Sequence, residues 1–156
     1  MEAGKHVICE KPLVSSLKEV DELEKISKET SKIIFPVFQY RYGLGFSKLK
    51  ALIKSGLAGK PLVASLETHW NRGKDYYSKP WRGTWEGEQG GAILSHSIHI
   101  HDLVSMILGP VSNVFAKLTT RVNDIEVEDC AAPSIEMENG TPVSYTHLRA
   151  HETSID

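Results

Sequence analysis

Only two cysteines, Cys9 and Cys130, occur among the 156 residues, and they lie far apart in the sequence. Two distant thiols do not form the disulfide framework of a small secreted protein, so we expect a reduced, cytoplasmic protein. The opening residues Met-Glu-Ala-Gly-Lys-His contain no apolar stretch of the kind that a signal peptide needs. No apolar run approaches the ~20 residues of a membrane-spanning helix, which argues against a membrane protein.

Charge of either sign is not in excess. Eighteen Lys and Arg against 20 Asp and Glu give a net charge of −2, so there is no basic surplus for binding nucleic acid. Hydrophobic residues make up 40% of the chain and charged residues 24%, as in ordinary soluble domains that bury a core. Composition therefore names a broad class, and the function must come from the motifs.

Apolar residues recur at helical spacing in some segments and at strand spacing in others. Ser16-Leu-Lys-Glu19 has the form of a capping box at the start of a helix. Pro36 and Pro133 interrupt strand patterns and favour edge positions, and Asn139-Gly140 is a strong hairpin signal. We predict helices over about 16–31, 46–55 and 90–108, β-rich segments over 4–9, 32–42, 62–70, 111–122 and 129–137, and a long polar loop over 71–89.

The last residues change character after the Asn-Gly turn. A returning strand is expected there, but residues 143–156 offer little alternation. The stretch Val143–Thr153 resembles translated sequencing-adapter read-through. We therefore predict that 143–156 is a non-native tail outside the fold, the alternative being a genuine frayed terminus. His147 and His151 receive no functional role in either case.

A strand-like run near the start ends abruptly at a charged pair and a proline. Gly4-Lys-His-Val-Ile is followed by Cys9-Glu-Lys-Pro12, which places Glu10 and Lys11 at the carboxyl end of a short strand. Ligands of open parallel sheets bind at that edge. The pair is therefore placed for chemistry.

The densest group of titratable residues lies in the predicted helix over 90–108. Ser95, His99 and Asp102 fall at i, i+4 and i+7, with His96 beside them, so we expect them to share one helix face. A metal site is disfavoured because the helical zinc signature, with its catalytic glutamate, is absent. Ordinary packed histidines and a general acid/base histidine both remain open.

Five motifs occur in an order that resembles the Gfo/Idh/MocA oxidoreductases, the family of glucose–fructose oxidoreductase and inositol dehydrogenase. The resemblance covers about residues 1–142. The motifs are Gly4–Pro12, Tyr40-Arg41-Tyr42, Ser55–Pro61, the Gly90-Gly91 helix with His99 and Asp102, and Glu126-Val-Glu-Asp129.

This resemblance implies an α/β fold in two parts. Residues 1–41 would be the C-terminal remnant of a Rossmann dinucleotide-binding domain. Residues 42–142 would be a partial α+β domain for substrate binding and oligomerisation, with a mainly antiparallel sheet and helices on one face. The full-length protein would be a homo-oligomer that acts on a small sugar or polyol.

The implied cofactor is NAD or NADP. The G-x-G-x-x-G turn that holds the pyrophosphate is absent from this sequence, so we expect the N-terminal part of the Rossmann domain to be missing and the chain by itself to be inactive. The leading interpretation is hydride transfer between nicotinamide and a sugar, cyclitol or related hydroxy compound. The alternatives are a non-catalytic binding or regulatory protein and an NAD-dependent glycosidase-type hydrolase.

Residue roles follow from the resemblance. Lys11 and His99 would be catalytic, the lysine hydrogen-bonding the substrate hydroxyl and the histidine accepting its proton. Glu10, Lys11 and Pro12 would contact the cofactor, and Lys11-Pro12 would be a cis peptide. Ser95 and His96 would bind substrate. Ser95 stands where the family often has an aspartate, so His96 would compensate or the substrate would differ.

The remaining candidates would bind substrate. Asp102 would contact it or cap a loop, and Arg41 would contact it or pair with an acid. Trp81 and Arg82 in the polar loop suit a polyol, because sugars stack on aromatic rings, although a packed Ω-loop would use the same residues.

Overall fold

A computed structural model of the chain describes residues 1–148 and divides it into two compact units, Met1–Gln39 and the part from Tyr40 onward. The division lies two residues before the boundary expected from the sequence. None of the helices within the described residues is long and apolar enough to cross a membrane.

The first unit is a parallel β-α-β arrangement. Strand β1 (Val7–Cys9) pairs in parallel with β2 (Ile34–Pro36), and helix α1 (Leu17–Thr30) connects them. The predicted helix cap at Ser16 is confirmed, because the backbone N–H of Glu19 donates to the Ser16 hydroxyl. The return bond of the capping box is shifted by one residue: the Glu19 carboxylate accepts from the backbone N–H of Ser15 and from the Ser16 hydroxyl. Because parallel strands share one direction, β1 and β2 end at the same edge.

The second unit begins with the short helical turn η1 (Gln39–Tyr42, whose first residue closes the first unit). Its other helical segments are α2 (Leu44–Lys54), α3 (Lys74–Tyr77), α4 (Trp85–Glu88), the wide π-turn η2 (Ile93–Ser97) and α5 (Ile98–Leu108). Its strands are β3 (Ala64–His69), β4 (Val111–Thr119), β5 (Cys130–Met137) and β6 (Pro142–Leu148).

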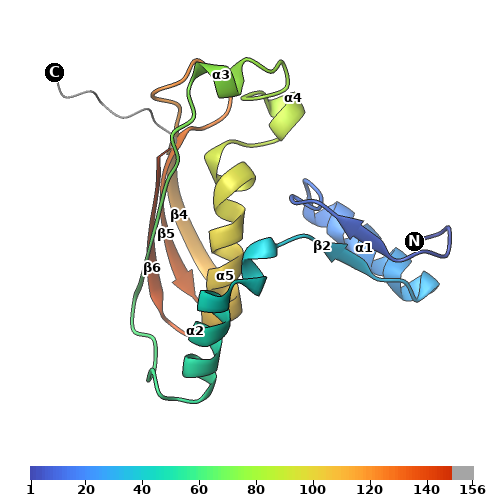
Figure 1. Ribbon diagram of the computed structural model, residues 1–156, viewed down its shortest axis with the longest axis vertical. Coiled ribbons are helices and arrows are strands. Elements are labelled where there is room, and N and C mark those ends of the chain that lie inside the picture. Colours follow the sequence, from blue (N-terminus) through green and yellow to red (C-terminus); the bar gives the residue numbers. More distant parts are fainter. Residues whose placement is uncertain (149–156) are drawn as a thin grey trace. The chain divides into compact units, whose positions relative to one another are not determined.

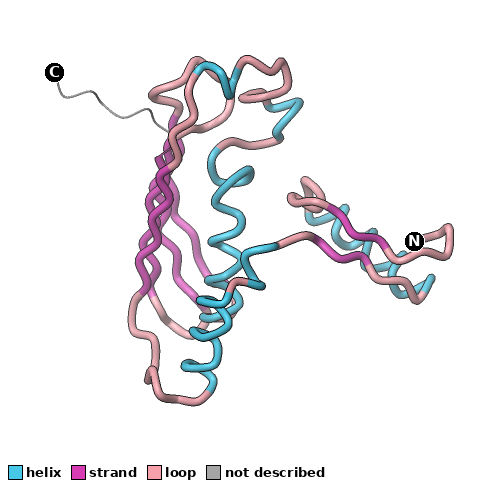
Figure 2. Tube along the Cα trace, in the orientation of Figure 1, coloured by secondary structure: helices cyan, strands magenta, loops and turns pink. Residues whose placement is uncertain are grey.

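These four strands form one sheet in the order β3-β6-β5-β4. Only β3 and β6 run parallel, so the sheet is mainly antiparallel as predicted. Figure 1 shows α2 and α5 on one face of this sheet. Figure 2 shows the loop that contains α3 and α4 at one end of the sheet. The expected α+β architecture with helices on one face is confirmed.

The core lies between α5 and the sheet. Buried residues alternate along β5, as expected for a strand with one face packed and one face open. Each fully buried side chain of this size contributes about 1.5–3 kcal/mol to stability. The core consists of Leu108, Ile135, Met137 and Val143, flanked by Ala64, Leu66, Val104 and Ile107.

Two sequence-based predictions are corrected here. Pro133 does not lie at an edge, because β5 is an interior strand of the sheet. Residues 130–131 and 134–136 of β5 pair with β6, and Pro133 lies in the gap between these two stretches. The strand therefore accommodates a residue that has no N–H to donate.

The predicted exclusion of residues 143–156 from the fold is wrong for 143–148, which belong to β6 between β3 and β5. Val143, Tyr145 and His147 are buried and alternate with exposed Ser144 and Thr146, which is the period of two of a strand with one packed face. The adapter-like origin of this stretch stays a prediction. Residues 149–156, including His151, lie outside the described residues.

Candidate functional site

The Glu-Lys-Pro motif follows directly on β1 in the first unit. Glu10 and Lys11 come after Cys9, the last residue of the strand, at the edge where β2 also ends. The Lys11–Pro12 peptide is cis, as the resemblance implied. The motif therefore has the predicted place in the fold, and the cofactor contacts of Glu10, Lys11 and Pro12 stay predictions.

In the second unit, Glu128 fixes the start of the histidine-bearing helix. Its carboxylate accepts hydrogen bonds from the backbone N–H groups of Gly91 and Ile93, at 2.9 and 3.0 Å. Its own carbonyl accepts from the N–H of Ala92 at 2.9 Å. Helix starts leave such N–H groups without partners, and a carboxylate there also suits the helix dipole. Glu128 thus aligns the segment that carries both candidate histidines.

The neighbouring acids of the Glu126-Val-Glu-Asp129 motif hold other loops. Glu126 accepts from the N–H of Trp85, the first residue of α4. Asp129 accepts from the N–H groups of Arg121, Val122 and Asn123. Burial raises the pKa of the Asp129 carboxyl, but these hydrogen bonds outweigh it and lower the pKa below its ordinary value. The motif is visible in the sequence, but the backbone N–H groups that its acids bind are not.

The π-turn η2 divides the helix face that the sequence predicted. The His99 ring stacks on Tyr40, with centroids 4.6 Å apart and ring planes at 24°. The His96 ring meets Trp70 edge-on at 4.6 Å and 73°. Both histidines are buried, at 5% and 7% exposure, but they contact different aromatic rings. A wide turn inserts extra backbone, so the 3.6-residue spacing assumed from the sequence does not hold across it.

Ser95 contacts His96, its neighbour in the chain. The Ser95 hydroxyl lies 2.7 Å from the carbonyl oxygen of Gly91 and 2.7 Å from Nδ1 of His96. A carbonyl oxygen can only accept, so the single hydroxyl proton goes to Gly91 and the second contact is favourable when Nδ1 donates. This geometry fits a His96 ring that carries a proton on Nδ1 and donates it to the Ser95 oxygen.

Arg41 and Asp102, both predicted to bind substrate, bind each other. Nε of Arg41 donates to Oδ2 of Asp102 at 2.7 Å, and Nη2 donates to Oδ1. Hydrogen bonding to Asp102 raises the pKa of the Arg41 guanidinium. Of the two roles considered for Arg41, the structure shows the acid pairing. The pair ties η1 to α5 and carries Tyr40 onto His99, a contact that the sequence did not reveal.

Replacing Arg41 with alanine is expected to release Tyr40 from His99. The Asp102 side chain is only 11% exposed and would lose its partner, which we expect to lower the free energy of unfolding by about 1–2 kcal/mol. Ring-current shifts of the His99 protons in NMR spectra measure the stacking. Arg121→Ala, at an exposed position, is the matched control. Unchanged His99 shifts in Arg41→Ala would contradict this prediction.

In the polar loop, Arg82 is held by protein groups. Nη1 of Arg82 donates to Glu88 at 2.7 Å, and the guanidinium lies over the rings of Trp81 and Tyr76 at 3.9 and 4.3 Å. Trp81 remains 46% exposed. The contacts favour a packed loop for Arg82, while the predicted substrate contact of Trp81 stays a prediction.

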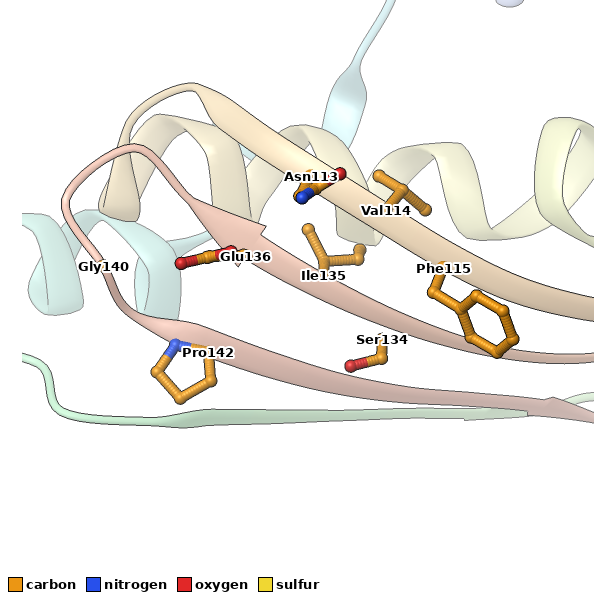
Figure 3. A pocket seen from close by; sticks show the side chains of 8 residues that line it. All are labelled: Asn113, Val114, Phe115, Ser134, Ile135, Glu136, Gly140 and Pro142. Atoms are coloured by element: carbon orange, nitrogen blue, oxygen red, sulfur yellow. The ribbon is translucent and has the colours of Figure 1, made fainter.

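A shallow hollow of about 500 Å³ lies elsewhere, along β4, β5 and the start of β6 (Figure 3). Glu136 is the one titratable side chain among its lining residues. The hollow contains no acid/base pair and does not include the histidines. The candidate site is therefore the helix segment over 95–102 with its aromatic neighbours.

Comparison with known proteins agrees with this arrangement. The model of the GFO/IDH/MocA C-terminal domain matches residues 46–154, and that of the oxidoreductase family with an NAD-binding Rossmann fold matches residues 1–38. The myo-inositol 2-dehydrogenase of Thermotoga maritima is 33% identical over 123 residues, which are 78% of this chain and 35% of that protein.

Solved structures give the same result. The WlbA dehydrogenase of Bordetella pertussis, in complex with NADH and UDP-GlcNAcA, is 29% identical with a TM-score of 0.89, over 96% of this chain and 43% of that one. The WlbA enzyme of Chromobacterium violaceum, with the same ligands, is 32% identical with a TM-score of 0.84, over 95% and 44%. The chain thus spans less than half the length of these relatives. It belongs to the Gfo/Idh/MocA oxidoreductase family, with a segment of the NAD-binding Rossmann fold followed by the C-terminal domain.

Proposed function

We propose that the protein containing this chain is an NAD(P)-dependent oxidoreductase that transfers hydride between nicotinamide and a sugar, cyclitol or related hydroxy compound. The observation that carries the proposal is the buried His99, held by Tyr40 on the helix that Glu128 aligns. Relatives named myo-inositol 2-dehydrogenase and WlbA dehydrogenase, the latter bound to NADH and UDP-GlcNAcA, support the same chemistry.

The first unit fits the cofactor. Its parallel β-α-β arrangement ends both strands at one edge, and Glu10, Lys11 and Pro12 follow the first strand there, where nucleotides bind to Rossmann sheets. These three residues would hold the nicotinamide end. When bound, the cofactor supplies an acceptor for the hydride that leaves the carbinol carbon.

The protein's own residues manage the proton. A hydroxyl that becomes a carbonyl loses a proton, and a neutral imidazole such as His99 accepts it within hydrogen-bond distance. We assign Lys11 the catalytic role that the resemblance implies, an ammonium that hydrogen-bonds a substrate hydroxyl. Ser95 and His96 are proposed to bind a further substrate hydroxyl. Asp102 and Arg41 position η1, which is the role that their ion pair favours.

The test is an assay on a protein of the relatives' length that carries this segment. Incubation with NAD⁺ or NADP⁺ and a panel of cyclitols and sugars is expected to give net reduced nicotinamide. Release of sugar from a glycoside without net reduction would instead support the glycosidase alternative. Binding of both ligands without either product would support the non-catalytic alternative. A cytoplasmic location and a homo-oligomer stay predictions from the sequence.

A further inference from the structure

Arg41, Arg72 and Arg82 of the second unit all contact other side chains, and Arg72 differs from the other two. Arg41 has Asp102 and Arg82 has Glu88 as carboxylate partners. Within residues 1–148, no carboxylate oxygen lies within 4.0 Å of the Arg72 guanidinium, and the buried Nε of Arg72 has no hydrogen-bond partner. Among the residues that the structure describes, Arg72 is therefore a cation without a carboxylate partner.

This arrangement has a cost in free energy. A buried N–H donor without an acceptor costs about 1–3 kcal/mol, and more when the group is charged. The Arg72 guanidinium lies over the rings of Trp70 and Tyr76, at 4.9 and 4.8 Å. Such contacts contribute roughly 0.5–2 kcal/mol and fix the guanidinium, but they neither neutralise its charge nor accept its Nε proton. The fixed cation retains the capacity to bind an anion.

Arg82 provides the comparison within the same cluster. It also lies over Tyr76, yet its charge is balanced by Glu88, whose side chain is only 3% exposed. Arg72 and Arg82 both lie over Tyr76. Within the described part of the chain, however, Arg82 has a carboxylate partner and Arg72 has none.

The open cation lies next to the candidate site. The His96 ring contacts Trp70 at 4.6 Å and Tyr76 at 6.2 Å, the two rings that hold Arg72. Arg72 is therefore separated from His96 by a single layer of aromatic side chains. Arg72 and His96 therefore border the same pair of aromatic rings.

We propose that Arg72 binds a carboxylate of the substrate, so that the substrate class is a hydroxy acid of the sugar-acid type rather than a neutral polyol. The planar fork of a guanidinium matches a carboxylate in two parallel hydrogen bonds, and the two aromatic rings fix its orientation in advance. This inference rests on the proposed function, because it names the substrate of the same site.

The test compares two ligands that differ at one carbon. D-glucuronate has a carboxylate where D-glucose has a hydroxymethyl group. Each is titrated into the 156-residue chain while NMR follows the Arg72 Nε–H and Trp70 indole signals. We expect glucuronate to shift both signals and to bind about tenfold or more tightly than glucose, since about 1.4 kcal/mol is one decade in affinity.

Three variants make the result specific. Arg72→Gln is expected to reduce glucuronate binding to the level of glucose, while Arg72→Lys retains part of it because the charge remains without the fork. Arg121→Gln removes one exposed positive charge elsewhere and is expected to leave binding unchanged. Equal binding of the two ligands, absence of a shift, or full binding by Arg72→Gln would overturn the proposal.

The two proposals fail separately. Hydride transfer by the longer protein to neutral sugars alone, with no effect of Arg72→Gln, would overturn the carboxylate assignment and leave the oxidoreductase function intact. Glucuronate binding at Arg72 in a protein that transfers no hydride would overturn the proposed function instead.

Discussion

Gly91→Ala is expected to lower the free energy of unfolding by about 4 kcal/mol, which is most of the stability of a marginal domain. A Cβ at this position would lie 1.9 Å from the carbonyl oxygen of Glu128 and 2.8 Å from its carboxyl carbon. Both atoms belong to the residue that aligns the histidine-bearing helix. Moving Glu128 aside would also remove its hydrogen bonds to the N–H groups of Gly91 and Ile93, and buried groups without partners cost about 1–3 kcal/mol.

Urea unfolding followed by circular dichroism measures the difference. Gly45→Ala is the matched control, because Gly45 lies in α2 with nothing within 4 Å of an added Cβ. Alanine in a helix is favoured over glycine by about 0.5–1 kcal/mol, so this variant should be slightly more stable. A Gly91→Ala protein as stable as the unaltered chain would show that Glu128 does not hold the helix start as described.

His99→Ala, in a protein of the relatives' length, is expected to lower turnover by about 10²–10⁴-fold. The alanine removes the group that accepts the hydroxyl proton. Cofactor affinity should change little, because the NAD-binding family model matches residues 1–38 and His99 lies in the second unit. Steady-state kinetics and fluorescence titration with reduced cofactor separate the two effects.

Two further variants test the assignment of the proton acceptor. His69→Ala changes an exposed histidine on β3 and should leave turnover unaltered. Tyr40→Phe retains the ring that stacks on His99 and should retain most of the turnover, whereas Tyr40→Ala should not. Full activity of His99→Ala would move the acid/base role to His96 or to another group.

Local patterns in the sequence predicted most of the secondary structure. The capping box at Ser16 and Glu19, the Asn139-Gly140 turn and the helix ending at Leu108 all depend on contacts between near neighbours, which are readable from spacing. The strand over 143–148 could not be predicted in this way, because alternation over a few residues is a weak signal until the neighbouring strands are known.

The order of motifs determined the family, and with it the two-part organisation. The Glu-Lys-Pro motif, the Gly-Gly helix and the Glu-Val-Glu-Asp motif can each be identified from the amino-acid sequence alone. What Glu128 does became visible only when its carboxylate was found at the N–H groups of Gly91 and Ile93, more than thirty positions away.

The sequence by itself therefore determined the elements, the family and the residues that could carry chemistry. Tertiary structure decided their partners: Arg41 with Asp102, Tyr40 on His99, Ser95 with His96, and Arg72 on two rings with no acid beside it among residues 1–148. The physical reason is range. Capping and periodicity act over three or four residues, whereas ion pairs and ring contacts join segments up to 61 positions apart and depend on how the chain folds between them.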